Sequence, residues 1–254
     1  GSTGRVYCLD ACTGATLWES NLGPEAERVE KMRQECRTKR VMPTLNLDFC
    51  SCPLALDGVL VCNDNKEGLI GLDAATGKQL WGPVPGCIRK TSSPAPWRHA
   101  GRDYVVTAFQ KAVCVDPRSG RILWELTEEV ANEGTPAVWR DYMVVSGAGK
   151  NSTGLTCLKM DLTHAEKAWC LGRKYNNHVT SPLIYQGHVY AFWEEETICV
   201  DIATGKIVAS SPFPGVRSCS SLVGADGRIL REHLYQQLFF YKADPKDFRQ
   251  LGPW

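Results

Sequence analysis

The sequence predicts an all-β fold, a β-propeller built from four-stranded blades, and two observations lead to this prediction. The first is a recurring phrase, apolar-x-small-apolar-Asp-x-x-Thr-Gly-x-x-apolar-Trp, in which two strand-like segments flank a tight turn. The second is the spacing of 43, 45, 40 and 43 residues between the marker aspartates Asp73, Asp116, Asp161, Asp201 and Asp244. A period of about 40–45 residues is typical of one propeller blade.

Each copy of the phrase predicts a β-hairpin. The aspartate starts the turn by accepting from backbone N–H groups, and glycine closes it in the left-handed conformation. A hairpin alone is marginal in water, so we expect its tryptophan to dock on the neighbouring repeat. The repeat residues are Asp10, Gly14 and Trp18; Asp73, Gly77 and Trp81; Asp116, Gly120 and Trp124; Trp169 of a weak copy that starts at Cys157; and Asp201 and Gly205, with Ala209 in place of tryptophan.

The inner half of each blade is visible as a small residue followed by proline and then by a polar turn. Each pair starts a first strand, and each turn leads to a second strand, which gives four strands per unit. The pairs with their turns are Cys52-Pro53 with Asp57-Gly58, Ser93-Pro94 with Ala100-Gly101, Thr135-Pro136 with Arg140-Asp141, and Ser181-Pro182 with Gln186-Gly187.

We expect about five blades plus a half in one domain that covers residues 1–254. Residues 5–19 supply only the two outer strands of a blade, and full units follow at about 48–82, 89–125, 132–170, 178–209 and 217–254. This count favours an N-terminally trimmed piece of a longer protein, with an unusual ring closure as the alternative. Residues 20–47 form an insertion with a helical pattern, interpreted as a surface helix on the propeller flank or, alternatively, as a lid or docking element.

Charge and composition exclude some classes of function. The 29 Lys and Arg residues balance the 28 Asp and Glu residues, whereas a nucleic-acid binder has a basic excess. The chain contains no run of 18 apolar residues, so the sequence predicts no membrane span. Gly1-Ser2 resembles the remnant of an expression tag, and an export signal would then not be visible.

The twelve cysteines are interpreted mainly as small buried residues of the repeat. Cys8, Cys114 and Cys199 lie two residues before the aspartate, and we place Cys157 in the same column. Two alternatives remain open. A disulfide between Cys157 and Cys170 would bridge one hairpin, and a zinc site is less favoured because no second pair answers Cys50-Ser51-Cys52.

Alignment of the blades on the small-residue–proline pair brings one set of polar residues to the mouth of the central channel. Arg89, Lys90, His178 and Arg217 are suited to holding an anion such as a carboxylate. The alternative is that these groups hydrogen-bond to neighbouring loops and to channel water. The full set of candidate ligand-binding residues is Asp48, Arg89, Lys90, Asn132, Glu133, Asn177, His178 and Arg217. The sequence predicts no catalytic residue and no metal site.

The phrase resembles the repeat of the quinoprotein-type (PQQ-like) β-propellers, and the resemblance covers nearly the whole chain outside about 20–47. The family contains PQQ-dependent alcohol dehydrogenases and a non-enzymatic, BamB-like branch, so the resemblance indicates fold better than function. The dehydrogenases bind calcium through Glu, Asn and Asp, and they use a disulfide between adjacent cysteines. This chain has no Cys-Cys pair. PQQ and calcium are therefore expected by family analogy alone, with oxygen ligands drawn from Asp48, Asn132, Glu133 and Asn177.

We therefore expect a non-enzymatic scaffold of the BamB-like branch that holds a protein partner by loops or blade edges and needs no cofactor. The resemblance implies a periplasmic or otherwise exported bacterial protein, with a cytoplasmic location as the alternative. The alternative function is a small-molecule sensor or enzyme that binds an anion or a sugar at the channel mouth. A PQQ-dependent dehydrogenase ranks third.

Overall fold

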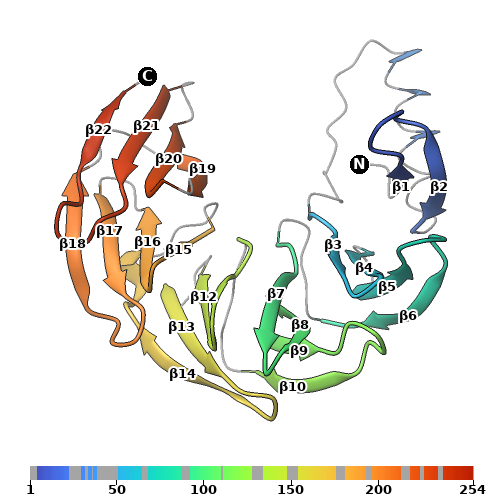
Figure 1. The fold of residues 1–254 in the computed structure, drawn as a ribbon, viewed down its shortest axis with the longest axis horizontal. Helices are drawn as coiled ribbons and strands as arrows, with labels where there is room; N and C mark the ends of the chain where they lie inside the picture. Colours follow the sequence, from blue (N-terminus) through green and yellow to red (C-terminus); the bar gives the residue numbers. More distant parts are fainter. Residues whose placement is uncertain are drawn as a thin grey trace.

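The computed structural model is an open ring of β-sheets (Figure 1). The N-terminal and C-terminal sheets lie at the two ends of the arc, and the intervening sheets follow it in chain order. This architecture confirms the predicted propeller. The structure describes residues 5–22, 30–31, 34–35, 37–38, 51–64, 68–86, 92–109, 111–127, 134–147, 154–175, 181–192, 196–212, 218–223, 226–233 and 237–253.

One two-stranded sheet and five four-stranded antiparallel sheets make up the arc, and we number them from the first to the sixth in chain order. The strands are β1 (Arg5–Leu9) and β2 (Thr16–Asn21); β3 (Leu54–Leu56), β4 (Val59–Asn63), β5 (Leu69–Asp73) and β6 (Gln79–Val84); β7 (Ala95–His99), β8 (Arg102–Ala108), β9 (Ala112–Val115) and β10 (Ile122–Leu126); β11 (Ala137–Trp139), β12 (Tyr142–Ser146), β13 (Leu155–Met160) and β14 (Ala165–Cys170); β15 (Leu183–Tyr185), β16 (His188–Phe192), β17 (Glu196–Asp201) and β18 (Ile207–Pro212); and β19 (Ser218–Val223), β20 (Arg228–His233), β21 (Gln237–Lys242) and β22 (Gln250–Pro253).

Helical residues accompany the strands at two places in the described part of the chain. A single 3₁₀ turn, η1 (Arg173–Tyr175), follows β14. Within the predicted insertion, residues 30–31, 34–35 and 37–38 are helical, and all six are exposed. Val29, Met32 and Cys36, the apolar positions on which the predicted helical pattern rests, lie outside the described residues, as does the rest of the insertion beyond residue 22 apart from these six positions.

The aspartate of each phrase organises its turn through its carboxylate. In the second sheet, Asp73 Oδ1 accepts from the backbone N–H of Thr76 at 2.7 Å and from the Thr76 hydroxyl at 2.8 Å. Gly77 then closes the turn at φ +72°, where a side chain would be strained. The same pair of contacts joins Thr13 to Asp10 and Thr204 to Asp201. The Thr in the phrase therefore stabilises the turn by a side-chain contact as well as by its backbone.

The tryptophan of one sheet docks on the turn of the next sheet. Trp18 Nε1 donates to the Ala74 carbonyl at 3.0 Å, and Trp81 Nε1 donates to the Pro117 carbonyl at 2.8 Å. The third such bond joins Trp169 to the Ile202 carbonyl at 2.7 Å. In all three cases the acceptor is the residue directly after the aspartate, so the predicted docking of tryptophan on the neighbouring repeat is confirmed.

The turn glycine has no side chain, and this leaves room for the docked indole ring to pack against the backbone. A Cβ atom added to Gly120 would lie 2.6 Å from the Trp81 ring, and one added to Gly77 would lie 2.5 Å from the Trp18 ring. Glycine is therefore required at this position for its positive φ and, independently, for the space that the ring occupies. The two requirements explain why Asp-x-x-Thr-Gly and Trp occur together in the sequence.

The fourth and sixth sheets differ from this pattern, and the difference corrects the alignment made from the sequence. The N–H after the marker position donates to the turn between the first two strands, from Ala74 to Gly58 in the second sheet and from Met160 to Asp141 in the fourth. Lys159, and not Asp161, therefore takes the aspartate position. Lys242 does so in the sixth sheet, because Ala243 makes the equivalent bond to Gly227. With these residues the period becomes 43, 43, 42 and 41.

The longer turns of the fourth and sixth sheets receive no indole hydrogen bond among the described residues. Met160 stays in the ladder opposite Ala165 and does not enter the turn, and Trp124 Nε1 is buried with no partner among the described residues. Ahead of the sixth sheet the tryptophan itself is replaced by Ala209. There Phe248, from the longer turn, packs 5.3 Å from the Tyr190 ring and occupies the interface.

A second set of contacts joins the sheets at their inner strands. The backbone N–H of Cys52 donates to the Ser93 hydroxyl at 2.8 Å, and that of Ser93 donates to the Thr135 hydroxyl at 3.3 Å. The N–H of Thr135 in turn donates to the Ser181 hydroxyl at 2.9 Å. The small residue before proline is therefore a hydroxyl acceptor for the preceding sheet, which explains why Ser or Thr takes this position.

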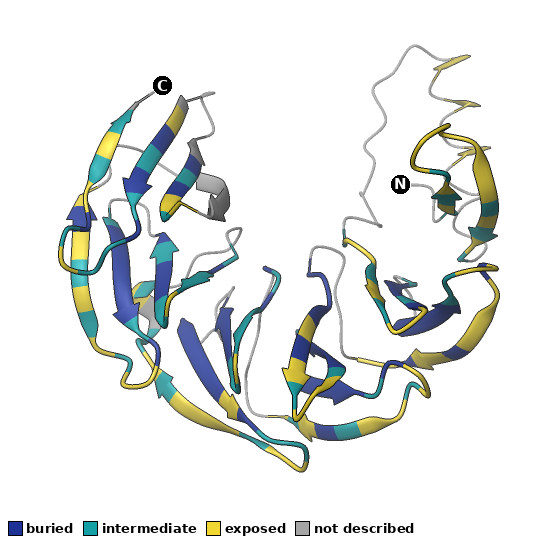
Figure 2. Cartoon of the chain, viewed as in Figure 1, coloured by how far each residue is buried: buried dark blue, intermediate teal, exposed yellow. Residues whose placement is uncertain are grey.

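The second and third strands of the four-stranded sheets carry most of the buried core, as the dark blue segments of Figure 2 show. Val113, Cys114 and Val115 are fully buried, as are Cys157 and Cys199 in the equivalent column. Desolvation raises the pKa of the Cys114 and Cys157 thiols to about 12, so both are neutral and unreactive. The alternative of a Cys157–Cys170 disulfide is wrong, because Cys170 faces Thr156 across the hairpin and both thiols are free.

We expect Trp81→Ala to lower the free energy of unfolding by about 3–5 kcal/mol, because it empties a buried site between two sheets. Leu80→Ala is the matched control, since Leu80 is 51% exposed on the same strand and should cost less than about 1 kcal/mol. Urea denaturation of the two variants measures both values. Equal losses would show that Trp81 has no special role in docking.

We also expect the protein to lose stability in acid through its turn aspartates. Hydrogen bonds from Thr163 lower the pKa of Asp161 to about 2, and the pKa values of Asp10, Asp73 and Asp201 are lowered by the corresponding threonines. Because the folded-state pKa lies below the unfolded value of about 3.9, this stabilisation is complete above about pH 4 and is lost as pH falls toward 2.

The measurement is urea denaturation as a function of pH, with Thr76→Val as the test variant. Removal of the Thr76 hydroxyl takes away the largest contribution to the lowered Asp73 pKa, so the acid slope should become shallower. A stability that stays constant down to pH 2 in the parent protein would contradict this account of the turns.

Candidate functional site

The eight residues predicted to line the channel mouth all lie outside the described residues. They are Asp48, Arg89, Lys90, Asn132, Glu133, Asn177, His178 and Arg217. They belong to the segments that lead from one sheet into the next, so the anion site expected from them stays a prediction. The same holds for the oxygen ligands that family analogy suggests for calcium.

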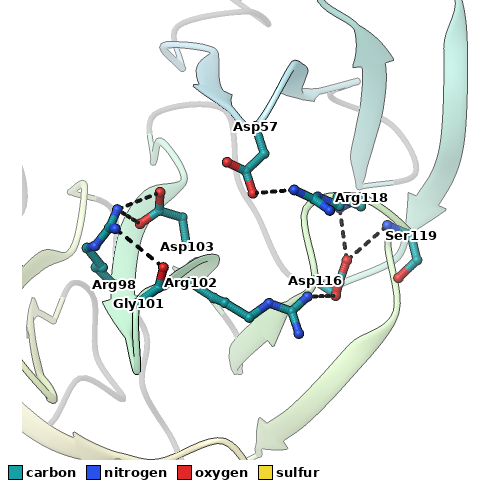
Figure 3. A network of polar contacts seen from close by, with 8 residues as sticks. All are labelled: Asp57, Arg98, Gly101, Arg102, Asp103, Asp116, Arg118 and Ser119. Atoms are coloured by element: carbon teal, nitrogen blue, oxygen red, sulfur yellow. Dashed lines mark hydrogen bonds and ion pairs between the residues drawn. The ribbon is translucent and has the colours of Figure 1, made fainter.

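The described part of the molecule offers a different candidate, at the opposite ends of the strands. In each four-stranded sheet, the turn between the first and second strands and the turn between the third and fourth strands lie at the same end of the sheet. Figure 3 shows a network of polar contacts at this end of the second and third sheets. We call the surface formed by Arg98, Arg102, Arg118 and Arg140 the arginine patch.

Two contacts hold arginines of the patch close to the marker aspartate of the third sheet. Arg118 is part of the turn, where its backbone N–H donates to Asp116 Oδ1 at 2.9 Å, and its guanidinium donates to Asp57 of the second sheet at 3.3 Å. Arg102 approaches the other carboxylate oxygen of Asp116 at 3.7 Å. The turn aspartate therefore positions two arginines while its first oxygen organises the backbone (Figure 3).

The other two arginines belong to the first hairpins of the third and fourth sheets, Arg98 in strand β7 and Arg140 in the turn between β11 and β12. Arg98 contacts both oxygens of Asp103 at 3.2 Å and also donates to the Gly101 carbonyl. Arg140 stacks on the Trp139 ring, with its guanidinium carbon 4.5 Å from the ring centre. A planar guanidinium held against an aromatic ring still presents its N–H groups to solvent.

Two contacts of Asp141, which follows Arg140 in the chain, join the fourth sheet to the third. Asp141 Oδ1 accepts from Trp97 Nε1 at 3.2 Å, and it lies 2.8 Å from His99 Nδ1. The Trp97 side chain is fully buried, and its ring lies 5.0 Å from the His99 ring. These contacts join the third and fourth sheets next to Arg98 and Arg140 in the chain, as the Arg118–Asp57 contact joins the second and third.

The patch has the chemistry of a recognition surface for carboxylates. The side chains of Arg98, Arg102 and Arg118 are 69%, 65% and 68% exposed. Exposed ion pairs contribute little to stability, so these contacts orient the arginines more than they stabilise the fold. A guanidinium can bind a carboxylate by two parallel hydrogen bonds, and each of these arginines has N–H groups beyond those engaged in the contacts described above.

Sequence reasoning missed the arginine patch because it looked for ligands only at the channel mouth. The sequence did contain a signal, because four arginines each lie within two residues of a predicted turn. They are Arg98, Arg102, Arg118 and Arg140. What the sequence could not give is the alignment of these turns in adjacent sheets, which depends on the stacking of the blades.

In the described ranges, no three His, Cys, Asp or Glu side chains gather in a way that could hold a metal ion. No helix in the same ranges is long and apolar enough to cross a membrane.

Two solved structures resemble the chain in fold. The crystal structure of BamB from Moraxella catarrhalis matches with a TM-score of 0.58 and 14% identity, over 96% of this chain and 78% of that one. The β-propeller domain of Cps50 (Swd1) from Myceliophteria thermophila matches with a TM-score of 0.60 and 14% identity, over 81% and 72%. At this identity both likenesses show the fold alone.

Comparison at the level of sequence identifies the family. A search of curated proteins finds no match. The family described as outer membrane protein assembly factor BamB matches residues 1–211, which is most of the chain and includes the first five sheets. The repeat phrase, the tryptophan docking and the open ring of four-stranded sheets agree with this match, and the chain belongs to the family of outer membrane protein assembly factor BamB.

Proposed function

We propose that the chain is a non-enzymatic scaffold that binds a protein partner through the arginine patch. The observation that carries the proposal is the exposure of four arginines that are already oriented by contacts within and between neighbouring sheets. Side chains ordered before binding lose less conformational entropy when a partner arrives, and this raises affinity without new contacts.

The composition of the patch supports a protein partner. Arginine, tryptophan and tyrosine are the residue types enriched at the centres of protein interfaces. Arg140 lies on Trp139 at 4.5 Å, and Arg102 lies over Tyr104 at 5.8 Å from its ring centre. We infer that the partner presents Asp or Glu side chains to these arginines.

Membership of the family gives independent support. The family is named after an assembly factor of outer membrane proteins, and this name supports our inference that the chain acts by contact with other proteins. By this analogy the chain would act in an exported location such as the periplasm. The eight free thiols among the described residues favour a reducing compartment instead, because exported proteins tend to pair their cysteines. Fractionation of cells that express the natural protein decides between the two locations.

The test of the proposed function is charge reversal in the patch. We expect Arg118→Glu to abolish capture of the natural partner, because the new carboxylate repels an acidic partner surface. Lys206→Glu is the matched control, since Lys206 lies exposed beside the corresponding turn of the fifth sheet and outside the patch. Quantitative mass spectrometry of cross-linked complexes compares the two variants with the parent protein.

The proteins captured by the parent chain and by the two variants are compared. Proteins that are captured by the parent chain and by Lys206→Glu, but lost with Arg118→Glu, would support the patch as the binding surface. Identical sets of cross-linked proteins from all three forms would contradict it. Circular dichroism establishes that both variants keep the parent fold.

A further inference from the structure

The four arginines of the arginine patch differ in whether they already contact a carboxylate of this chain. Among the described residues, Arg140 contacts no carboxylate, and its guanidinium carbon lies 4.5 Å from the centre of the Trp139 ring. Arg140 is therefore the cation of the patch that no described aspartate neutralises. The other three are paired, Arg98 with Asp103 at 3.2 Å, Arg102 with Asp116 at 3.7 Å and Arg118 with Asp57 at 3.3 Å.

The turn that carries Arg140 does not itself require an arginine. It is a two-residue turn between β11 and β12, and its first residue, Arg140, has φ +52°. The equivalent positions of the second, third and fifth sheets have φ +49°, +47° and +48°, and they are occupied by Asp57, Ala100 and Gln186. An acid, a small apolar residue and an amide thus take the same backbone conformation. The arginine adds a cation that the shape of the turn does not need.

The indole ring on which Arg140 lies is held by the fifth sheet. A Cβ atom added to Gly187 would lie 3.4 Å from the Trp139 ring, so the ring packs closely on the turn of that sheet. Trp139 is half-buried, and it packs against the core that the fourth and fifth sheets share. The guanidinium stacked on this ring is therefore oriented before a partner arrives, and less conformational entropy is lost on binding.

A partner carboxylate gains more at Arg140 than at the paired arginines. At Arg98, an incoming carboxylate would compete with Asp103, which is part of the chain and loses no translational freedom on binding. At Arg140 it meets a guanidinium whose charge is not compensated, and this group can donate two parallel hydrogen bonds. Exclusion of water by the partner then strengthens the attraction between the opposite charges.

We propose that Arg140 and Trp139 are the anchor of the arginine patch, and that they bind an Asp or Glu of the partner that stands next to an apolar residue. The carboxylate would accept two hydrogen bonds from the Arg140 guanidinium, and the apolar side chain would cover the accessible part of the Trp139 ring. Arginine and tryptophan are the residue types on which binding energy at interfaces concentrates. This inference rests on the proposed function, to which it adds the contact that carries the affinity and the partner motif that this contact selects.

The test uses capped peptides of repeated Gly-Leu-Glu units as the probe. They are titrated into the protein while NMR follows the indole N–H resonance of Trp139, which should move to a saturating limit. Peptides of Gly-Leu-Gln units lack the carboxylate, and peptides of Gly-Ser-Glu units lack the apolar neighbour. Each of these two controls should bind at least about fivefold more weakly, because it lacks either the charge-assisted hydrogen bonds or the apolar contact.

Two alanine variants of the protein assign the contact. Arg140→Ala should weaken binding of the Gly-Leu-Glu peptide at least about tenfold, because it removes the uncompensated guanidinium. The turn should keep its shape, since Ala100 takes the same conformation in the third sheet. Arg98→Ala is the matched control, because it removes one exposed positive charge from the same patch, and it should weaken binding less than about threefold. Urea denaturation checks that both variants are folded.

Four results would overturn the inference. They are the absence of a saturable Trp139 shift in the parent protein, equal binding of the Gly-Leu-Gln peptide, equal binding of the Gly-Ser-Glu peptide, and equal losses for Arg140→Ala and Arg98→Ala. The proposed function fails separately, when Arg118→Glu leaves capture of the natural partner unchanged. Loss of that capture together with equal peptide binding by the two alanine variants would keep the patch as the binding surface and reject Arg140 as its anchor.

Discussion

The contact between a tryptophan and the turn of the next sheet is the interaction on which the rest of the molecule depends. The tryptophan on the fourth strand of one sheet donates to a backbone carbonyl of the next sheet and packs on a glycine of the same turn, as Trp81 does with Pro117 and Gly120. Each sheet alone would expose both faces, and no single hairpin would be stable in water. The docking fixes the angle and height of one sheet against the next. That alignment places Arg118 against Asp57 of the preceding sheet.

Where the turn of one sheet departs from the repeat, the tryptophan of the sheet before it changes its contact as well. This is expected because the turn and the tryptophan pack against each other. Where the fourth and sixth sheets lengthen their turns by two residues, the sheet before them loses either the partner of its indole or the indole itself. At the last interface Phe248 of the longer turn supplies aromatic volume against Tyr190. A change on one side of the interface is thus compensated on the other, and the interior stays filled.

Much of this fold could be predicted from the sequence because its signals are local. A turn of Asp, Thr and Gly acts over five residues, and the tryptophan stands at a fixed distance from it. The sequence alignment of the fourth sheet is wrong because Asp161 lies two residues after the true marker position and resembles the marker aspartate. The hydrogen bond from Met160 to Asp141 shows that Lys159 takes the marker position. The arginine patch could not be predicted, since it depends on which turns meet after the sheets have stacked. The residues expected at the channel mouth lie in segments outside the described ranges.

The most direct test of the central contact compares two chemically identical substitutions, Trp169→Phe and Trp124→Phe. Both remove an indole N–H and the same ring volume. The Trp169 N–H donates to Ile202 at 2.7 Å, whereas the Trp124 N–H is buried with no partner in the described structure. Urea denaturation should show Trp169→Phe to be the more destabilising by about 0.5–1.5 kcal/mol, the net value of one hydrogen bond. Equal losses, or a larger loss at Trp124, would contradict the claim that the carbonyl after the turn aspartate anchors each sheet to the one before it.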